Sequence, residues 1–347
     1  MIIGSYGSWF RREVCYRSKK LYDSKASDWE AQLIFEGSTY EYGTGIAQGG
    51  IVDTIYGDWY GFLFQDHDGL GRVPSILAVN WDYVDTKNNK YYPDWPMMGY
   101  YDDKGNFVNC LGTSQKVKNP LTIQLNKSDK ESYIVGDDDF SYPDFKEGDS
   151  LKKVWQWNHN PLDDCWSLTE RPGFLRLRTG KVVDNLFLAP NTLTQRMSGP
   201  KCSGVVAMDI SKMKEGDVAG FCAFNGLSGV LAVVMENGKK QWVMSHQSVS
   251  LSDREKRVTA VEVLEKERMD CEKEVVYLRM EGDFADKKDE ATFYYSYDKK
   301  TWKRIGEPCK MVFDYTKFFM GSKFAIFNYA TKDLGGYVDI DYFEYGN

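Results

Sequence analysis

Apolar and polar residues alternate in short runs along most of this 347-residue chain, as they do in half-buried β-strands. Two such runs, residues 51–54 and 59–64, flank Tyr56, Gly57 and Asp58. A turn that contains glycine between two alternating runs predicts a β-hairpin. We therefore expect antiparallel strands in this part of the chain.

The segment after this hairpin concentrates polar groups. Residues 65–72 read Gln-Asp-His-Asp-Gly-Leu-Gly-Arg, so carboxylates, an imidazole, a guanidinium and two glycines share eight positions. Loops at the ends of buried strands often carry binding or catalytic residues. A solvated hairpin end is the competing interpretation, and this pattern does not separate the two.

From about residue 154 the chain becomes a series of short strands separated by glycine turns. The expected strands lie at residues 191–196, 204–210, 218–224, 230–235, 241–244, 257–264, 274–281, 292–296, 324–329 and 335–345. Such spacing without a helical stretch predicts a β-sandwich. Within it, Leu175 and Leu177 alternate with Arg176 and Arg178, so the arginines should face away from the leucines.

Length and the change of pattern predict two domains, residues 1–145 and 150–347. The less patterned residues 101–150 form the expected connection. Its acidic run, residues 137–139, is either a solvated loop or a place for a cation.

Composition fits an all-β globular protein. Hydrophobic residues make up 42% and charged residues 27%, while aromatic residues reach 15% and glycines number 31. Aromatic faces also stack on sugars, although a β-sheet core explains most of them.

Charge and cysteine content exclude several classes of protein. The net charge is −7 without a basic stripe, so we expect no nucleic-acid partner. Seven cysteines without paired spacing indicate mostly reduced, buried thiols. No apolar run is long enough to span a membrane, so we expect no membrane partner, and the first twelve residues lack the features of a secretory signal.

Several strings resemble glycoside hydrolase family 43, whose members are mostly β-xylosidases and α-L-arabinofuranosidases. Residues 45–53, 59–67 and 71–74, followed by Trp81 and Asp94-Trp95-Pro96, resemble the last blades of that family's five-bladed propeller, and residues 5–12 and 14–19 fit another blade. Residues 155–345 resemble its C-terminal concanavalin A-like domain. The resemblance implies an all-β fold: an incomplete propeller in residues 1–145, then a β-sandwich in residues 150–347.

The same resemblance assigns substrate-binding residues. Arg72 matches an arginine that reaches the substrate, and Gln48 stands where many relatives place a polar residue of the site. Some relatives have a histidine near this position that holds a central cation through water, and Gln48 departs from them. Trp9 and Phe10 fall near the sugar site, although aromatic residues at strand ends also serve packing.

Two alternatives concern the loop itself. Arg72 either contacts substrate or is held by a neighbouring carboxylate, Asp66 or Asp68. His67 is either a functional residue of the sugar site or a satisfied structural histidine.

The family hydrolyses O-glycosyl bonds with inversion, which requires a carboxylate base and a carboxylic acid, and it adds an Asp that tunes the acid. The resemblance places all three before the strands matched here, so we expect an N-terminally truncated propeller and assign no catalytic residue. Glu13 and Glu36 fall outside the matching places, and Asp66 has no proton-transfer role in the family.

A metal site is a separate expectation. Asp339 and Asp341 alternate with apolar residues near the chain end, so both carboxylates should point to one face. Such a pair suits a structural Ca²⁺, and a solvated face is the alternative. We expect no other cofactor.

Two functions follow. The first is a family 43-like protein of xylan or arabinoxylan breakdown that lacks its catalytic carboxylates and is inactive alone. The alternative is a non-catalytic carbohydrate-binding β-sandwich. Either takes an oligo- or polysaccharide as partner. Relatives of the family are often exported.

Overall fold

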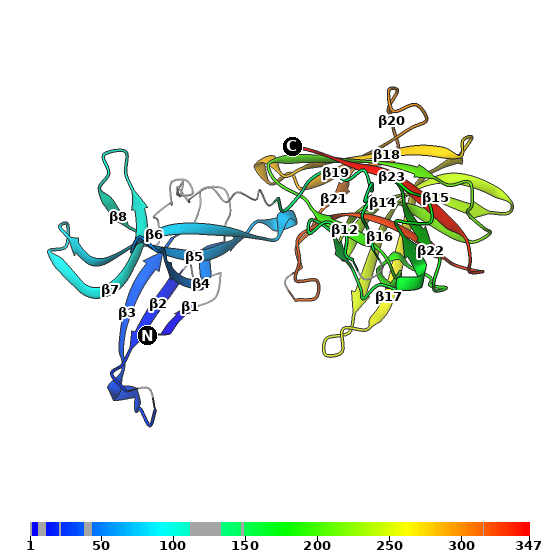
Figure 1. The fold of residues 1–347 in the computed structure, drawn as a ribbon. Coiled ribbons are helices and arrows are strands. Elements are labelled where there is room, and N and C mark those ends of the chain that lie inside the picture. Colours follow the sequence, from blue (N-terminus) through cyan, green and yellow to red (C-terminus); the bar gives the residue numbers. More distant parts are fainter. Residues whose placement is uncertain are drawn as a thin grey trace. The chain divides into compact units, whose positions relative to one another are not determined.

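The computed structural model describes residues 2–5, 12–20, 22–37, 44–111, 133–146, 149–314 and 316–347, with side chains from residue 12 onward. The chain divides into two compact units, drawn in Figure 1. The first comprises Met1–His67 and Gly71–Asp129, and the second comprises Asp68–Leu70 and Lys130–Asn347. Residues 133–146, expected as a connection, thus belong to the second unit.

The described residues form strands and short 3₁₀ turns, without an α-helix, so the predicted all-β class is confirmed. No helix in this part of the chain could cross a membrane. The 3₁₀ turns are η1 (Ala26–Asp28), η2 (Asp68–Leu70), η3 (Asp163–Cys165), η4 (Leu186–Leu188) and η5 (Ala285–Lys287).

Two antiparallel sheets build the first unit, in the orders β1-β2-β3 and β4-β5-β6-β7-β8. Their strands are β1 (Ile2–Ser5), β2 (Arg12–Arg17), β3 (Glu30–Glu36), β4 (Ile46–Asp53), β5 (Trp59–Asp66), β6 (Arg72–Asp85), β7 (Lys90–Tyr101) and β8 (Phe107–Asn109). The predicted hairpin is β4–β5, whose turn is closed by a hydrogen bond from Thr54 N to Asp58 O at 2.8 Å. Gly57 takes a φ of +87° there, which glycine adopts without strain.

One hydrophobic cluster joins both sheets of the first unit. Cys15, Ile34 and Phe35 come from the small sheet, and Leu63 and Leu77 come from the larger one. None of these five side chains is more than 2% exposed. Strands β2 and β4 are therefore neighbours.

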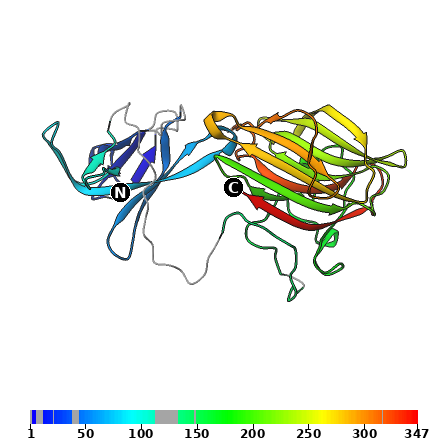
Figure 2. The same ribbon diagram turned by 90° about the horizontal axis from the view of Figure 1, so that it is seen from above.

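Two larger antiparallel sheets build the second unit and lie face to face (Figure 2). The first contains β10 (Trp166–Ser167), β11 (Leu175–Arg178), β23 (Tyr337–Gly346), β13 (Lys201–Asp209), β18 (Val275–Asp283), β19 (Glu290–Ser296) and β20 (Lys303–Arg304), with β21 (Cys309–Lys310) beside β19. The second contains β17 (Val258–Asp270), β16 (Lys239–Leu251), β15 (Leu227–Glu236), β14 (Asp217–Phe224), β22 (Lys323–Ala330), β12 (Leu193–Arg196) and β9 (Gln156–Trp157). This is the predicted sandwich.

The sandwich core lies between these sheets. Val206 and Leu278 of one sheet share a cluster with Phe221 and Trp242 of the other. Strand β14 is buried along its whole length, because Cys222 and its neighbours on the opposite face pack in a second cluster with the segment around Leu186. A strand that is covered on both faces has a nearly continuous apolar sequence, and this is true of β14.

The local predictions for arginines and cysteines also hold. Leu175 and Leu177 enter the core, whereas Arg176 and Arg178 point away and pair with Glu170. All seven cysteines are free thiols and five of them are buried. Burial raises the pKa of the Cys110 thiol to about 12.

Candidate functional site

Arg72 is the centre of a polar cluster in the first unit. It begins β6 directly opposite Asp66, the last residue of β5, and its Nε donates to Asp66 Oδ1 at 3.1 Å. Its Nη1 donates to Gln48 Oε1 at 3.2 Å, and its guanidinium carbon lies 4.1 Å from the centre of the Phe64 ring. Three predicted site residues, Arg72, Asp66 and Gln48, therefore meet. Of the two alternatives for Arg72, the structure contains the one in which a neighbouring carboxylate, Asp66, holds the guanidinium.

Gln48 reaches Arg72 from a β-bulge in β4. The pairing of β4 with β5 shifts between Ala47 and Gly50, and Gln48 takes a φ of +57° in the left-handed region. Gly49 is required beside it, since a Cβ there would lie 1.8 Å from Phe62 O. Bulges of this kind redirect one side chain out of the regular alternation.

Glu13 of β2 stabilises the bulge through a hydrogen bond. This residue was not assigned to the site from the sequence. Its Oε1 accepts a hydrogen bond from the Gln48 backbone N–H at 2.5 Å. The side chain is fully buried, and its Oε2 has no hydrogen-bond partner among the described residues. Burial raises the pKa of Glu13 to about 7, against the lowering effect of the Gln48 N–H. Glu13 stands next to Arg12 in the sequence, so nothing local indicated that its side chain would be buried.

His67 lies at the end of the same hairpin. Its Nε2 is 3.2 Å from Oε1 of the buried Gln65, whose Nε2 in turn donates to Thr44 O at 2.6 Å. Burial lowers the pKa of His67 to about 4, so the imidazole is neutral at neutral pH. This environment favours the structural alternative for His67. Trp9 and Phe10 lie outside the described residues.

The predicted metal pair lies in the second unit, on β23. Asp339 Oδ1 accepts from Arg176 Nε at 2.7 Å, and its Oδ2 accepts from Arg176 Nη2 at 2.9 Å and Arg171 Nη1 at 3.0 Å. Both oxygens thus already face guanidinium groups, whereas Asp341 is exposed. Across the described residues no group of three or more His, Cys, Asp or Glu is arranged to hold a metal ion. The calcium site stays a prediction that this donor set does not favour.

The buried Glu13 carboxyl predicts a pH-dependent stability for the first unit. The folded state binds its proton more tightly than the unfolded state, whose pKa is near 4.5. The contribution of Glu13 to the free energy of unfolding should therefore fall by up to about 3 kcal/mol as pH rises from 4.5 through 7, and then level off. His67 opposes this trend, because its lowered pKa adds stability as pH rises from about 4 to 6.5. Calorimetric unfolding at several pH values tests this: the free energy of unfolding of the unaltered chain minus that of Glu13→Gln should fall over this pH range.

The matched control for this prediction is Glu36→Gln. Glu36 is also buried, but it pairs with Arg12 Nε at 2.8 Å. This variant should be destabilised and should keep the pH slope. An unchanged slope in Glu13→Gln would contradict the assignment of the raised pKa to Glu13.

Comparisons with known proteins agree with this architecture. Residues 143–346 match the family described as the beta xylosidase C-terminal concanavalin A-like domain. A β-xylosidase of Formosa agariphila is 27% identical over 361 residues, which cover 96% of this chain and 53% of that protein. The chain thus spans about half the length of this curated relative.

Two solved structures extend the match across both units. A bifunctional GH43-CE protein of Bacteroides eggerthii is 37% identical with a TM-score of 0.73, covering 98% of this chain and 38% of that one. A GH43 glycoside hydrolase, engineered to display both endo-xylanase and exo-arabinofuranosidase activity, is 27% identical with a TM-score of 0.75, covering 97% and 61%.

The second unit is therefore a concanavalin A-like sandwich of the type appended to β-xylosidases. The chain belongs to glycoside hydrolase family 43.

Proposed function

We propose that this chain supplies the sugar-recognition part of a family 43 glycosidase acting on xylan or arabinoxylan. In this proposal the two sheets of the first unit belong to an incomplete five-bladed propeller, and Arg72 binds the terminal pentose. The observation that carries the proposal is the Arg72–Asp66–Gln48 cluster, because it joins three strands around the arginine that the family resemblance assigns to the substrate.

The geometry suits recognition of a polyhydroxyl ligand. The ion pair to Asp66 and the hydrogen bond to Gln48 fix the plane of the Arg72 guanidinium above Phe64. A guanidinium held in one orientation offers forked donors to neighbouring hydroxyl oxygens with little loss of side-chain entropy on binding. The bulge at Gln48 would therefore act as a support for the substrate-binding arginine.

Proton transfer is assigned to none of the described carboxylates of this cluster. Glu13 has a raised pKa, but a fully buried carboxyl cannot reach a glycosidic oxygen. Asp66 is held by Arg72, and Glu36 is held by Arg12. We infer that none of these three carboxylates is the acid or the base of the inverting reaction.

The test combines binding with turnover. Calorimetric titration with xylobiose and an arabinoxylo-oligosaccharide should show binding, while p-nitrophenyl β-D-xyloside and p-nitrophenyl α-L-arabinofuranoside should not be hydrolysed. Turnover by this chain would mean that one of its own carboxylates transfers the proton. Absence of binding to every pentoside would contradict sugar recognition by the Arg72 cluster.

The alternative, a non-catalytic carbohydrate-binding sandwich, has a separate observation in its favour. The second unit carries a cleft with aromatic and acidic walls, far along the chain from the Arg72 cluster.

A further inference from the structure

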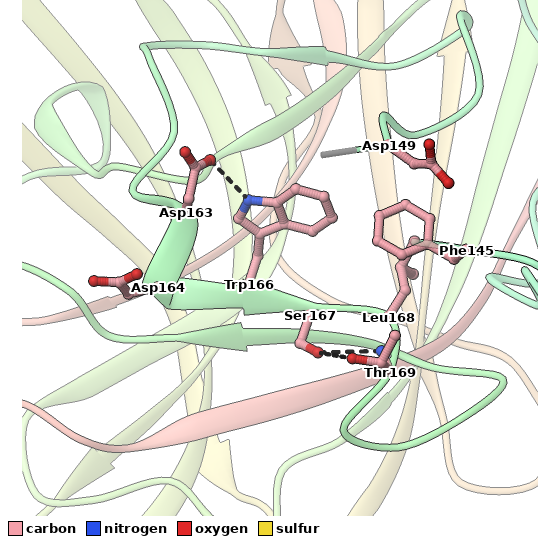
Figure 3. A pocket seen from close by; sticks show the side chains of 8 residues that line it. All are labelled: Phe145, Asp149, Asp163, Asp164, Trp166, Ser167, Leu168 and Thr169. Carbon is pink, nitrogen blue, oxygen red and sulfur yellow. Dashed lines mark hydrogen bonds between the residues drawn. The ribbon is translucent and has the colours of Figure 1, made fainter. Parts of the chain in front are cut away.

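A cleft of about 640 Å³ opens on the second unit beside β10 (Figure 3). Phe145, Trp166 and Leu168 supply its apolar wall, and Asp149, Asp163 and Asp164 supply carboxylates. Its volume lies within the range of small-ligand sites. We call it the Trp166 cleft.

The aromatic wall is built from rings that support one another. The Phe145 and Trp166 rings meet at 74° with their centres 6.0 Å apart, and Trp157 meets Trp166 at 52° and 5.5 Å. Edge contacts of this kind hold a ring in one orientation. Trp166 is further fixed by its place on β10, opposite Leu177 of β11.

The loop that presents Phe145 is anchored by a buried carboxylate. Asp138 accepts hydrogen bonds from Tyr142 Oη at 2.7 Å, Trp155 Nε1 at 2.8 Å and Lys152 Nζ at 2.9 Å. Its backbone exchanges two hydrogen bonds with Phe343 of β23. Asp138 is therefore an anchor for the cleft, whereas Asp137 and Asp139 on either side of it are exposed.

Carboxylates of the cleft accept hydrogen bonds but form no ion pairs with lysine or arginine among the described residues. Asp149 Oδ2 accepts from the Lys146 N–H at 2.8 Å, and Asp163 Oδ1 faces Trp166 Nε1 at 3.5 Å. Figure 3 shows the Trp166 ring between Asp163 and Phe145, whereas Asp164 points away. Among the described residues none of the three aspartates has an ion-pair partner, and they do not converge as a metal site.

We propose that the Trp166 cleft is a second carbohydrate-binding site, which takes a short neutral pyranose oligosaccharide. The apolar face of a pyranose ring packs on Trp166, and hydroxyl groups donate to Asp149 and Asp163, which as carboxylates only accept. The rigid rings and the Asp138 anchor form the site in advance, so little ordering is needed on binding. The choice of a xylan oligosaccharide as probe rests on the proposed function.

The test follows the indole N–H resonance of Trp166 in the ¹⁵N-labelled chain during titration with xylohexaose, with Trp166→Phe used to assign it. The resonance should shift on titration and should still shift in Arg72→Ala. Trp166→Ala lacks this resonance, so its affinity for xylohexaose at the cleft is measured by calorimetric titration; it should fall at least about tenfold, since a stacking ring is lost. The double variant Asp149→Asn, Asp163→Asn should keep the fold and weaken binding about three- to tenfold.

Trp302→Ala is the matched control, because Trp302 is also a half-buried tryptophan of the second unit but does not line this cleft. It should leave the titration unchanged. A Trp166 resonance that does not respond to xylohexaose overturns the proposal, and a response to hexalysine alone would assign the cleft to basic ligands instead. If the Trp166 resonance shifts with xylohexaose and Arg72→Ala changes no measured sugar affinity, the result supports the Trp166 cleft and counts against sugar binding by the Arg72 cluster.

Discussion

Replacing Arg72 with alanine should lower the affinity of the first unit for xylobiose by about 30- to 150-fold. Hydrogen bonds from a charged group contribute about 2–3 kcal/mol each when their partner is left without a substitute. Arg72→Lys should recover only a small part of the loss. An ammonium group cannot hold Asp66 and Gln48 at the same time while keeping a planar fork above Phe64.

The control for this series is Arg12→Ala. Arg12 also pairs with a buried acid of the first unit, Glu36, but it does not belong to the Arg72 cluster. Its replacement leaves the buried Glu36 carboxylate without this partner, so it should destabilise the fold measurably while leaving xylobiose affinity within about twofold. Equal losses of affinity in both variants would mean that Arg72 acts through stability alone. Titration calorimetry, with thermal unfolding of each variant, separates these outcomes.

The elements of the fold follow closely from the sequence because their causes are local. The β4–β5 hairpin follows from alternating residues around Gly57, and the outward direction of Arg176 follows from its position between Leu175 and Leu177. Both depend on the two-residue period of a strand and on the freedom of glycine in turns. Such signals are contained in a few consecutive residues.

The candidate site was only partly predictable because it depends on contacts between distant segments. Arg72 and Asp66 are close in sequence, and their pairing follows from the hairpin. Glu13 touches Gln48 across 35 positions of the chain, and this contact exists because β2 and β4 share one core. A bulge that turns Gln48 toward Arg72 also breaks the alternation on which sequence reasoning depends.

The partners of the acidic residues in the second unit were also not predictable from local sequence. Alternation on β23 correctly predicted that Asp339 points away from Val338 and Ile340. The nature of its partner was not predictable, since Arg171 lies 168 positions away. A carboxylate that looks suited to a cation in sequence is here engaged by two arginines. Asp138 likewise became an anchor only through Tyr142, Trp155 and Lys152.

Replacing Asp339 with asparagine should be among the most destabilising changes in the sandwich. Asp339 is buried and accepts two hydrogen bonds from Arg176 and one from Arg171, so the variant removes the carboxylate that the two guanidinium groups share. Arg171 keeps Asp209 and Arg176 keeps Glu170 as partners. The cost should therefore lie at or below the roughly 3–5 kcal/mol of breaking a buried ion pair from one side, and the Tm should fall by up to about 10 °C. Thermal unfolding measures this, with Asp341→Asn as the neighbouring exposed control. Addition of Ca²⁺ should leave the Tm of the unaltered chain unchanged; a rise of several degrees that either variant abolishes would instead make both aspartates calcium ligands.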